Sequence, residues 1–394
     1  MRFLVAILMC VVGLSGATPS GSPRSEPFPQ DAYIWQRVWT PAVVDAATHS
    51  ADMVRGWRVL VGEVDVSGRW TPAAVPWERL QVTGRPIVEV VRIDGRLDQG
   101  RMAEMLERIV TVAGTRGIAG VEIDYDCPTS KLPAYAGFLR SVRKRLPASL
   151  ALSITALPTW MGSASLGEVA APLDELVLQV HAIDDPRRGL LDAARAERWV
   201  RAFGHLVGKP FRVALPTYEV RVDWDADGRL ASVEAETPRL AHGPDHALLG
   251  ADPRVLQDFM VRLTRDAPEG MSGVVWFRLP VAGDVRAWGA ETWRAVVAGT
   301  FVAPKVRASL VPTHRPGLWT VTLSNDGAVD AVLPREVRLA SGCTAADGAN
   351  GFRVHIGAPL ALEAAAGGRL RPQKQRTIGW ARCVDPEREL HVVE

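Results

Sequence analysis

Short apolar runs alternate with helical patterns along the middle of the chain, and we count eight of each in order. Each apolar run has the length of a buried strand. The runs begin at Ala32, Trp57, Pro86, Ile118, Ser149, Glu175, Pro210 and Ser272. Between them apolar residues return every three or four positions, as in Met102 to Ala113, which is the spacing of an amphipathic helix. This alternation predicts an α/β protein with a parallel sheet.

Eight consecutive βα units are typical of a (βα)8 TIM barrel, and we predict one over residues 31–301. An open, doubly wound sheet is the rival architecture. No glycine-rich phosphate loop follows any of the eight runs, which favours the barrel.

After Phe301 the pattern changes to short alternating strands, which begin at Thr320, Pro334, Gly351 and Arg376. We predict a small β-sandwich-like domain over residues 302–394, close to the size of one such module. It either binds carbohydrate or braces the barrel. No row of exposed aromatic residues is visible, so we assign it no ligand.

The first residues have the features of an export signal. Arg2 precedes the apolar run from Phe3 to Gly16, which is too short to span the ~30 Å hydrocarbon layer of a membrane as a helix. We predict a signal peptide over residues 1–17 and a flexible leader over residues 18–30. The protein is then periplasmic or secreted from a bacterium, with no membrane anchor after signal cleavage.

Composition and cysteine content narrow the class of protein further. The 46 basic and 44 acidic residues leave a net charge of +2, which gives no electrostatic footprint for nucleic acid or an acidic membrane. Hydrophobic residues make up 47% of the chain, as in folded globular proteins. In an oxidising compartment Cys343 and Cys383 can form a disulfide, which leaves Cys127 unpaired. The sequence does not indicate the oligomeric state.

The fourth strand of the predicted barrel carries alternating acids. Glu122, Asp124 and Asp126 point to one face, while apolar neighbours point to the other, so we expect the acids to lie inside the barrel. Burial and like charge should raise at least one pKa, as a general acid requires. The structural alternative is that inward arginines such as Arg92 or Arg278 neutralise them.

The motif GVEIDYD resembles the strand-four signature of the family 18 chitinases. The resemblance implies that Asp126 is the catalytic acid, Asp124 the supporting carboxylate and Glu122 the deeper acid. The motif departs from the family pattern because Ala119 and Glu122 stand where it has aspartates and Asp126 replaces its glutamate. The shorter side chain withdraws the proton donor by ~1.5 Å, a displacement that can cost ~100-fold in rate.

The chain also resembles the bacterial family described as domain of unknown function 3142. The motifs that carry this resemblance are AYIWQRVW, DYD followed by Thr129, Ser130 and Tyr135, LSITALPTW, and GVVWFRLP. The resemblance spans roughly residues 30 to 300. It implies a glycosidase-like barrel and names no substrate.

Other residues at the strand ends are suited to a sugar cleft. Flat tryptophan faces stack on pyranose rings, and polar side chains fix the orientation of the sugar. The substrate-binding candidates are Trp35, Arg92, Trp160, Gln179, His181, Tyr218, Trp276 and Arg278. Alternatively, Trp35 and Trp276 fill the barrel interior and His181 is a hydrogen-bonded rim residue.

We predict no metal site and no cofactor. His181 has no histidine or cysteine at ligand spacing, and Cys127 should point away from the cleft. Residues 219–251 form an insertion after strand seven that we interpret as a β-hairpin beside the cleft. The insertion matches the calcium-loop pattern of Asp223, Asp225, Asp227, Gly228 and Glu234. Strand-like residues flank this loop where helices should, which favours a turn with solvated acids over a calcium site.

These features predict a secreted glycoside hydrolase with Asp126 as general acid and a carbohydrate as its partner. The second catalytic group, which acts together with this acid, is either the acetamido oxygen of the substrate or the carboxylate of Glu219, Asp65 or Asp184. Asp124 lies only ~6.7 Å along the strand from Asp126, so it is placed to tune that acid. The alternative is a non-catalytic polysaccharide-binding or envelope protein on the same barrel.

Overall fold

The computed structural model describes residues 26–95, 99–113, 117–181, 189–234, 245–365 and 367–393. The predicted signal peptide, and residues 18–25 of the predicted leader, lie outside the described residues. Within the described part of the chain, no helix has the length and apolar character needed to cross a membrane.

Eight parallel strands form a closed barrel. They are β1 (Gln30–Ile34), β2 (Gly56–Val64), β4 (Ile87–Ile93), β5 (Gly120–Tyr125), β6 (Ala151–Ala156), β7 (Glu175–Gln179), β8 (Phe211–Pro216) and β12 (Met271–Phe277). Each pairs with the next, β1 also pairs with β2 and with β12, and the sheet therefore closes on itself. The short β3 (Trp70–Pro72) adds to the edge of β2 as an antiparallel strand. The predicted TIM barrel is confirmed, and the open sheet is wrong.

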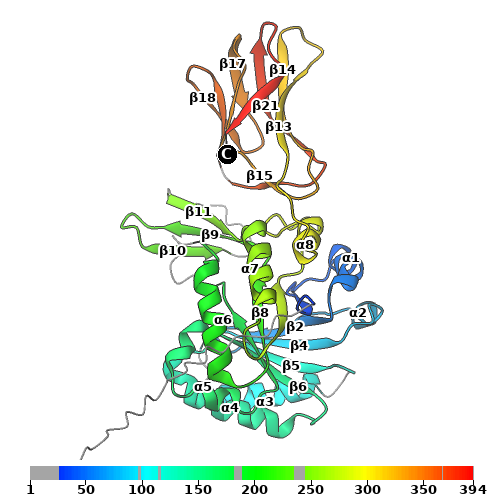
Figure 1. Ribbon diagram of the computed structural model, residues 1–394, viewed down its shortest axis with the longest axis vertical. Helices are drawn as coiled ribbons and strands as arrows, with labels where there is room; N and C mark the ends of the chain where they lie inside the picture. The colour runs from blue at the N-terminus through cyan, green and yellow to red at the C-terminus, as the bar shows by residue number, and fades with distance from the viewer. Residues whose placement is uncertain are drawn as a thin grey trace, which may run out of the picture.

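Helices cover the outside of the barrel (Figure 1). They are α1 (Pro41–Ser50), α2 (Trp77–Gln81), α3 (Gln99–Ala113), α4 (Leu132–Arg145), α5 (Leu166–Ala170), α6 (Ala193–Val207), α7 (Pro253–Arg265) and α8 (Ala290–Val297). The main hydrophobic core lies between these helices and the outward side chains of the strands. Helix α3 contains the predicted amphipathic segment.

Inside the barrel, the amino-terminal half of the strands carries a buried ion-pair network. We call Asp31, Arg58, Glu122, Glu175 and Arg212 the deep cluster. Arg58 contacts Glu122, donates to Glu175 Oε2 at 2.6 Å, and its Nε lies 3.5 Å from Asp31 Oδ2. Arg212 Nε donates to Glu175 Oε1 at 2.9 Å. The network places paired acids and arginines inside the barrel, below the strand ends.

The insertion after β8 forms a three-stranded antiparallel sheet in the order β10-β9-β11. Its strands are β9 (Glu219–Trp224), β10 (Leu230–Glu234) and β11 (Asp245–Gly250). Its apolar side chains, Val220, Val222 and Trp224, pack with Tyr218 and Phe277 at the top of the barrel. The chain thus has the predicted hairpin, and β11 extends it by a third strand.

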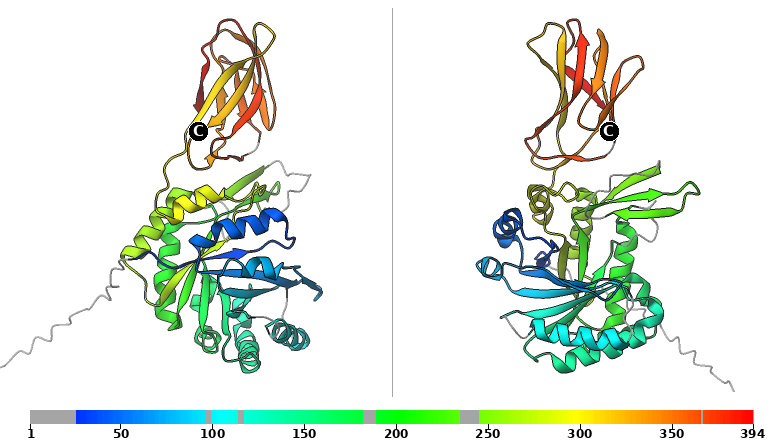
Figure 2. Two further views of the ribbon diagram at one scale, coloured as in Figure 1. Left: turned by 90° about the vertical axis from the view of Figure 1, so that its right-hand side faces the viewer. Right: turned by 180° about the vertical axis from the view of Figure 1, so that it is seen from behind.

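The carboxyl-terminal part is an antiparallel β-domain. Its strands are β13 (Val306–Pro312), β14 (Leu318–Asn325), β15 (Ala331–Val332), β16 (Glu336–Arg338), β17 (Cys343–Gly348), β18 (Phe352–His355), β19 (Ala361–Ala364), β20 (Arg369–Leu370), β21 (Gln375–Cys383) and β22 (Glu389–Val393). They enclose a core of their own, which includes Leu323, Val337, Leu362 and Ile378. A disulfide joins Cys343 of β17 to Cys383 of β21. Two views show this domain beyond the end of the barrel that carries β9 to β11 (Figure 2).

Candidate active site

A cleft of about 310 Å³ opens at the carboxyl ends of the barrel strands. This is the end at which TIM-barrel enzymes build their active sites. Fourteen side chains from the ends of seven strands and the loops that follow them line the cleft: Tyr33, Trp35, Arg37, Arg92, Asp94, Asp124, Asp126, Thr155, Gln179, His181, Ala214, Tyr218, Phe277 and Arg278.

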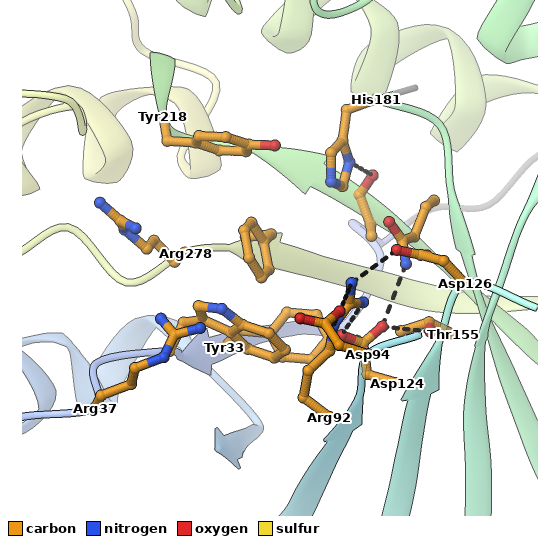
Figure 3. A pocket seen from close by; sticks show the side chains of 14 residues that line it. Tyr33, Arg37, Arg92, Asp94, Asp124, Asp126, Thr155, His181, Tyr218 and Arg278 are labelled. Atoms are coloured by element: carbon orange, nitrogen blue, oxygen red, sulfur yellow. Dashed lines mark hydrogen bonds and ion pairs between the residues drawn. The ribbon is translucent and has the colours of Figure 1, made fainter. Parts of the chain in front are cut away.

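Arg92 of β4 binds three carboxylates in the cleft (Figure 3). Its Nη1 donates to Asp124 Oδ2 at 2.8 Å, and its Nη2 donates to Asp126 Oδ2 at 2.9 Å and to Asp94 Oδ1 at 3.0 Å. We call these four residues the rim cluster. A planar guanidinium can serve several carboxylates because its donors point in fixed, divergent directions.

Asp124 and Asp126 differ in exposure although they lie on the same face of one strand. Asp124 is buried, and it accepts a further hydrogen bond of 2.6 Å from Thr155 Oγ1. Burial raises the pKa of the Asp124 carboxyl above its usual value, against the lowering effect of Arg92. The Asp126 side chain is 48% exposed and opens into the cleft. Asp126 is therefore the strand-four acid that a ligand can reach.

Glu122 lies below the cleft and does not line it, which corrects its assignment to the catalytic set. Its carboxylate is fully buried against Arg58, and it accepts hydrogen bonds from Tyr33 Oη at 2.5 Å and from Ser153 Oγ at 3.1 Å. Burial raises its pKa. Glu122 therefore contacts the cleft only through Tyr33, which lines it.

His181 forms one wall of the cleft. It stacks on Phe277 with ring centroids 5.8 Å apart, and Tyr218 meets it edge-on at 5.9 Å. Its Nδ1 lies 3.3 Å from the Ala214 carbonyl oxygen. Burial lowers the pKa of His181 to about 4, so the ring is neutral at pH 7.

Of the three predicted tryptophans, one lines the cleft. Trp35 lies there against Phe277, with ring centroids 5.0 Å apart. Trp276 points outward from β12, where its Nε1 donates to Gln30 and its ring packs on Trp288. Trp160 is also buried outside the barrel, and its Nε1 donates to the Cys127 carbonyl oxygen at 2.9 Å. The prediction that Trp160 and Trp276 bind sugar is wrong, because both are fully covered by other side chains.

The remaining predicted polar residues do line the cleft. Gln179 Nε2 lies 3.5 Å from Asp124 Oδ1. Tyr218 lies across the cleft from the rim cluster with its hydroxyl directed toward it, whereas the Arg278 guanidinium points away from the rim cluster (Figure 3). Arg278 Nη2 donates to Asp284 Oδ2 at 2.6 Å. The cleft therefore combines one acidic side with a side made of aromatic rings and hydrogen-bond donors.

Two of the three candidate second carboxylates do not line the cleft. Glu219 is buried against Arg369 of the carboxyl-terminal domain, and Asp65 closes a turn with Ser67 and Arg69. Asp184 lies outside the described residues. The free Cys127 is buried in the core between strand and helices, and burial raises its pKa to about 12, so its thiol stays protonated.

The calcium-loop pattern lies on the β9 to β10 hairpin. Asp223 accepts from Arg221 and Ser232, while Asp225 accepts backbone hydrogen bonds from Asp227 and Arg229 that close the turn. Protein donors thus use these acids, as in the turn interpretation. Among the described residues no cluster of three or more candidate ligands could hold a metal ion.

Six lining residues did not emerge from the sequence: Tyr33, Arg37, Asp94, Thr155, Ala214 and Phe277. Strand alternation contains a signal for three of them. Tyr33 has the parity of Trp35, Thr155 lies beside the strand-four acids, and Phe277 has the opposite parity to the outward Trp276. Asp94 and Arg37 lie just beyond strand ends, where alternation no longer applies.

Comparisons with known proteins agree with this geometry. Residues 83–282 match the family described as domain of unknown function DUF3142. The chain belongs to this family. Residues 308–384 match a second domain of unknown function, DUF8456. No curated protein matches the chain.

Solved structures with the same fold are chitinase-like TIM barrels. The spore cortex-lytic enzyme SleL of Bacillus cereus is 14% identical, with a TM-score of 0.53 over 72% of this chain and 76% of that chain. A chitinase from Chromobacterium violaceum is 13% identical, with a TM-score of 0.51 over 69% and 98%. A chitinase from Bacillus thuringiensis is 9% identical, with a TM-score of 0.50 over 93% and 100%. At these identities the likeness establishes the fold.

Proposed function

We propose that the protein hydrolyses O-glycosidic bonds of a polysaccharide or oligosaccharide, with Asp126 as the general acid. The observation that carries this proposal is the exposed Asp126 carboxylate beside the buried Asp124 in a cleft walled by aromatic rings. Flat rings and convergent hydrogen-bond donors bind sugars, and a positioned carboxyl group can protonate a glycosidic oxygen.

Because Asp126 is paired with Arg92, it must leave this ion pair before it can act as a general acid. A proton donor must be a carboxylic acid, so Asp126 has to take up a proton and turn from Arg92 toward the glycosidic oxygen. Arg92 Nη2 also contacts Asp94, and its Nη1 contacts Asp124, so the guanidinium keeps two partners when Asp126 leaves. After the proton has passed to the leaving group, the Asp126 carboxylate can return to Arg92.

The geometry reduces the number of candidates for the second catalytic group. Glu219 and Asp65 are outside the cleft. Asp94 lines it, but it binds the same nitrogen of Arg92 as Asp126, and a second carboxylate should attack from the opposite face of the sugar. This arrangement favours the substrate's own acetamido oxygen, with Asp184 as the remaining carboxylate candidate. The proteins with similar structures include a chitinase and a spore cortex-lytic enzyme.

Non-catalytic binding of a polysaccharide is the second candidate, and one observation favours it. Arg92 Nη2 holds the Asp126 carboxylate in an ion pair at 2.9 Å, so in this arrangement the carboxylate has a partner other than a glycosidic oxygen. Binding to the same aromatic cleft would then occur without cleavage.

Turnover separates the two candidates. We would incubate the protein with chitin oligosaccharides, peptidoglycan fragments and β-glucans and measure new reducing ends. For the glycan that is cleaved, Asp126→Asn should lower turnover by ~100-fold or more and preserve binding. Asp65→Asn is the matched control. It changes an aspartate in the turn after β2 that does not line the cleft, so this variant should cleave the glycan as the wild type does. Binding without cleavage would establish the second candidate, and full turnover by Asp126→Asn would reject the acid assignment.

Export from the cytoplasm is part of the proposal. The disulfide between Cys343 and Cys383 is of the kind that persists in oxidising compartments. The apolar run near the amino terminus supports the same location. Mass spectrometry of the mature protein from the periplasm or medium should find the chain cleaved after Ala17, and an intact amino terminus would contradict this.

A further inference from the structure

Two loops that carry cleft residues are joined to each other. Tyr218 follows β8, Arg278 follows β12, and both line the cleft. The Glu219 amide donates to the Arg286 carbonyl oxygen at 2.6 Å, and the Trp288 amide donates to the Thr217 carbonyl oxygen at 2.7 Å. We call residues 217–219 and 284–289 the paired loops. Because they share hydrogen bonds, a group that holds one of them holds both.

The carboxyl-terminal domain binds the paired loops through Arg371. Arg371 Nη2 donates to the carbonyl oxygens of Asp284, at 2.7 Å, and Ala287, at 3.1 Å. Its Nη1 donates to the buried Asp330 at 3.0 Å, and Asp330 in turn accepts from the Gly289 amide at 2.5 Å. Arg371 and Asp330 both belong to the carboxyl-terminal domain, and together they fix both ends of residues 284–289.

A second arginine, two residues away, holds the other loop. Arg369 Nη2 donates to Glu219 Oε1 at 2.5 Å, and the two side chains are only 6% and 12% exposed. Arg369 is in β20, which pairs with β15. Removal of one partner from a buried pair leaves an uncompensated charge, so this contact resists rearrangement.

The contact surface has room for these arginines because glycines stand opposite them. A Cβ at Gly250 would lie 2.8 Å from Glu219 Cγ and 3.3 Å from Arg369 Nη2. A Cβ at Gly289 would lie 3.0 Å from Asp330 Oδ1 and 3.3 Å from Arg371 Nη1. A side chain at either position would force Glu219 or Asp330 and the neighbouring arginine to shift. Glycine at these two positions therefore suits the observed arginine contacts.

We propose that the carboxyl-terminal domain is a positioning module for the cleft, and that Arg369 and Arg371 hold Tyr218 and Arg278 in their ligand-binding positions. The link to Arg278 is direct, because Arg371 binds the backbone of Asp284 and the Asp284 carboxylate accepts from Arg278 Nη2. Glu219 is the chain neighbour of Tyr218. Loops held in place before binding lose less entropy when a ligand arrives, which raises affinity. The effect on glycan binding rests on the proposed function, but the ordering of the paired loops does not.

Hydrogen exchange of the full-length protein tests the loop-ordering step without any glycan. Arg371→Met removes both carbonyl contacts, so amide exchange in residues 284–289 and 217–219 should rise about 10-fold while exchange in β4 to β7 stays unchanged. Arg371→Lys keeps the positive charge and some hydrogen-bond donors, so it should give a smaller rise in exchange. It replaces Arg371→Met in the experiment if Arg371→Met does not fold. Arg338→Met, which breaks a half-exposed pair with Glu336 inside the same domain, is the control. Wild-type exchange in the paired loops of both Arg371 variants would overturn the proposal.

A double-mutant cycle with a chitin hexasaccharide as probe tests the step to the cleft. Arg371→Met should weaken binding about 10-fold, and Arg278→Met should weaken it less in the Arg371→Met background than in the wild type, because the first change has already displaced Arg278. A domain that only stabilises the fold would give additive effects, and additivity would reject the positioning role. If the wild type does not bind the hexasaccharide, the chitin-like substrate class fails, and the exchange experiment alone decides whether the domain orders the paired loops.

Discussion

The deep cluster and the rim cluster contain the same types of residue but differ in exposure to solvent. Both group carboxylates around arginine inside one barrel, and strand β5 supplies Glu122 to the first and both Asp124 and Asp126 to the second. In the deep cluster the side chains of Arg58 and Glu122 are 2% and 0% exposed. In the rim cluster Arg92 is 21% exposed and Asp126 is 48% exposed.

The two clusters therefore differ in access to solvent more than in residue type, and under the proposed function the accessible cluster is the catalytic one. The deep cluster sets two arginines against three acids, and none of these five residues lines the cleft, so its ion pairs support the barrel and, through Glu122, the position of Tyr33. The rim cluster sets one arginine against three acids, and one of these acids faces the cleft. A carboxylate that shares its cation with two others can leave it without stranding a buried charge.

The largest expected effect comes from breaking the deep cluster. Arg58→Met leaves Asp31, Glu122 and Glu175 short of their shared cation, and loss of one partner from a buried network typically costs ~3–5 kcal/mol. Urea titration should show that decrease in the free energy of unfolding. Arg108→Met, which breaks a half-exposed helix pair with Glu104, should change it by less than ~0.5 kcal/mol. Equal effects of the two variants would contradict the comparison.

The burial of His181 should make the free energy of unfolding depend on pH. Its folded pKa of about 4 lies below the unfolded value of 6.5, so between these values the unfolded chain binds more protons. The stabilisation is therefore present above pH 6.5 and is lost as pH falls toward 4, by about 3 kcal/mol at ~1.4 kcal/mol per pKa unit. Unfolding measured from pH 4 to 7 should show this slope in the wild type and a weaker slope in His181→Gln. Parallel slopes would mean that His181 titrates normally.

Asp124 should change stability with pH in the opposite direction to His181. Burial raises its folded pKa above the unfolded value of 3.8, so its protonation favours the folded state below that pH, and this contribution is lost as pH rises through the folded pKa. The free energy of unfolding of Asp124→Asn, measured relative to the wild type, should therefore increase as pH rises from 3 upward. A relative free energy that stays constant with pH would show that Asp124 has the same pKa in both states.

Much of the fold could be predicted from the sequence, because strand and helix periods are local properties. The eight apolar runs match the eight barrel strands, and the alternation of Glu122, Asp124 and Asp126 correctly places these side chains inside. Alternation alone does not set depth along the barrel axis. Depth separates Glu122, which Arg58 covers, from Asp126 at the rim, and it depends on how neighbouring strands are staggered.

The errors in the predicted site have a similar origin. Trp276 and Phe277 are adjacent aromatic residues on β12, and which of them faces inward depends on strand parity, which places Val275 and Phe277 in the inner cluster. Trp160 lies just beyond β6, in a short helical turn where no strand parity applies. The support of the paired loops by Arg369 could not be predicted, because the contact with Glu219 spans 150 positions of sequence.

The most direct test of the account measures turnover and stability together for Asp126→Asn and Glu122→Gln. On the glycan that the wild type cleaves, Asp126→Asn should lose ~100-fold or more of its turnover while its free energy of unfolding stays within ~1 kcal/mol of the wild-type value. Glu122→Gln should mainly lower the free energy of unfolding, because the Glu122 carboxylate that it removes is buried in contact with Arg58 and Tyr33. Wild-type turnover by Asp126→Asn, or a loss of stability as large as that of Glu122→Gln, would contradict the assignment of the rim acids to function and the deep acids to structure.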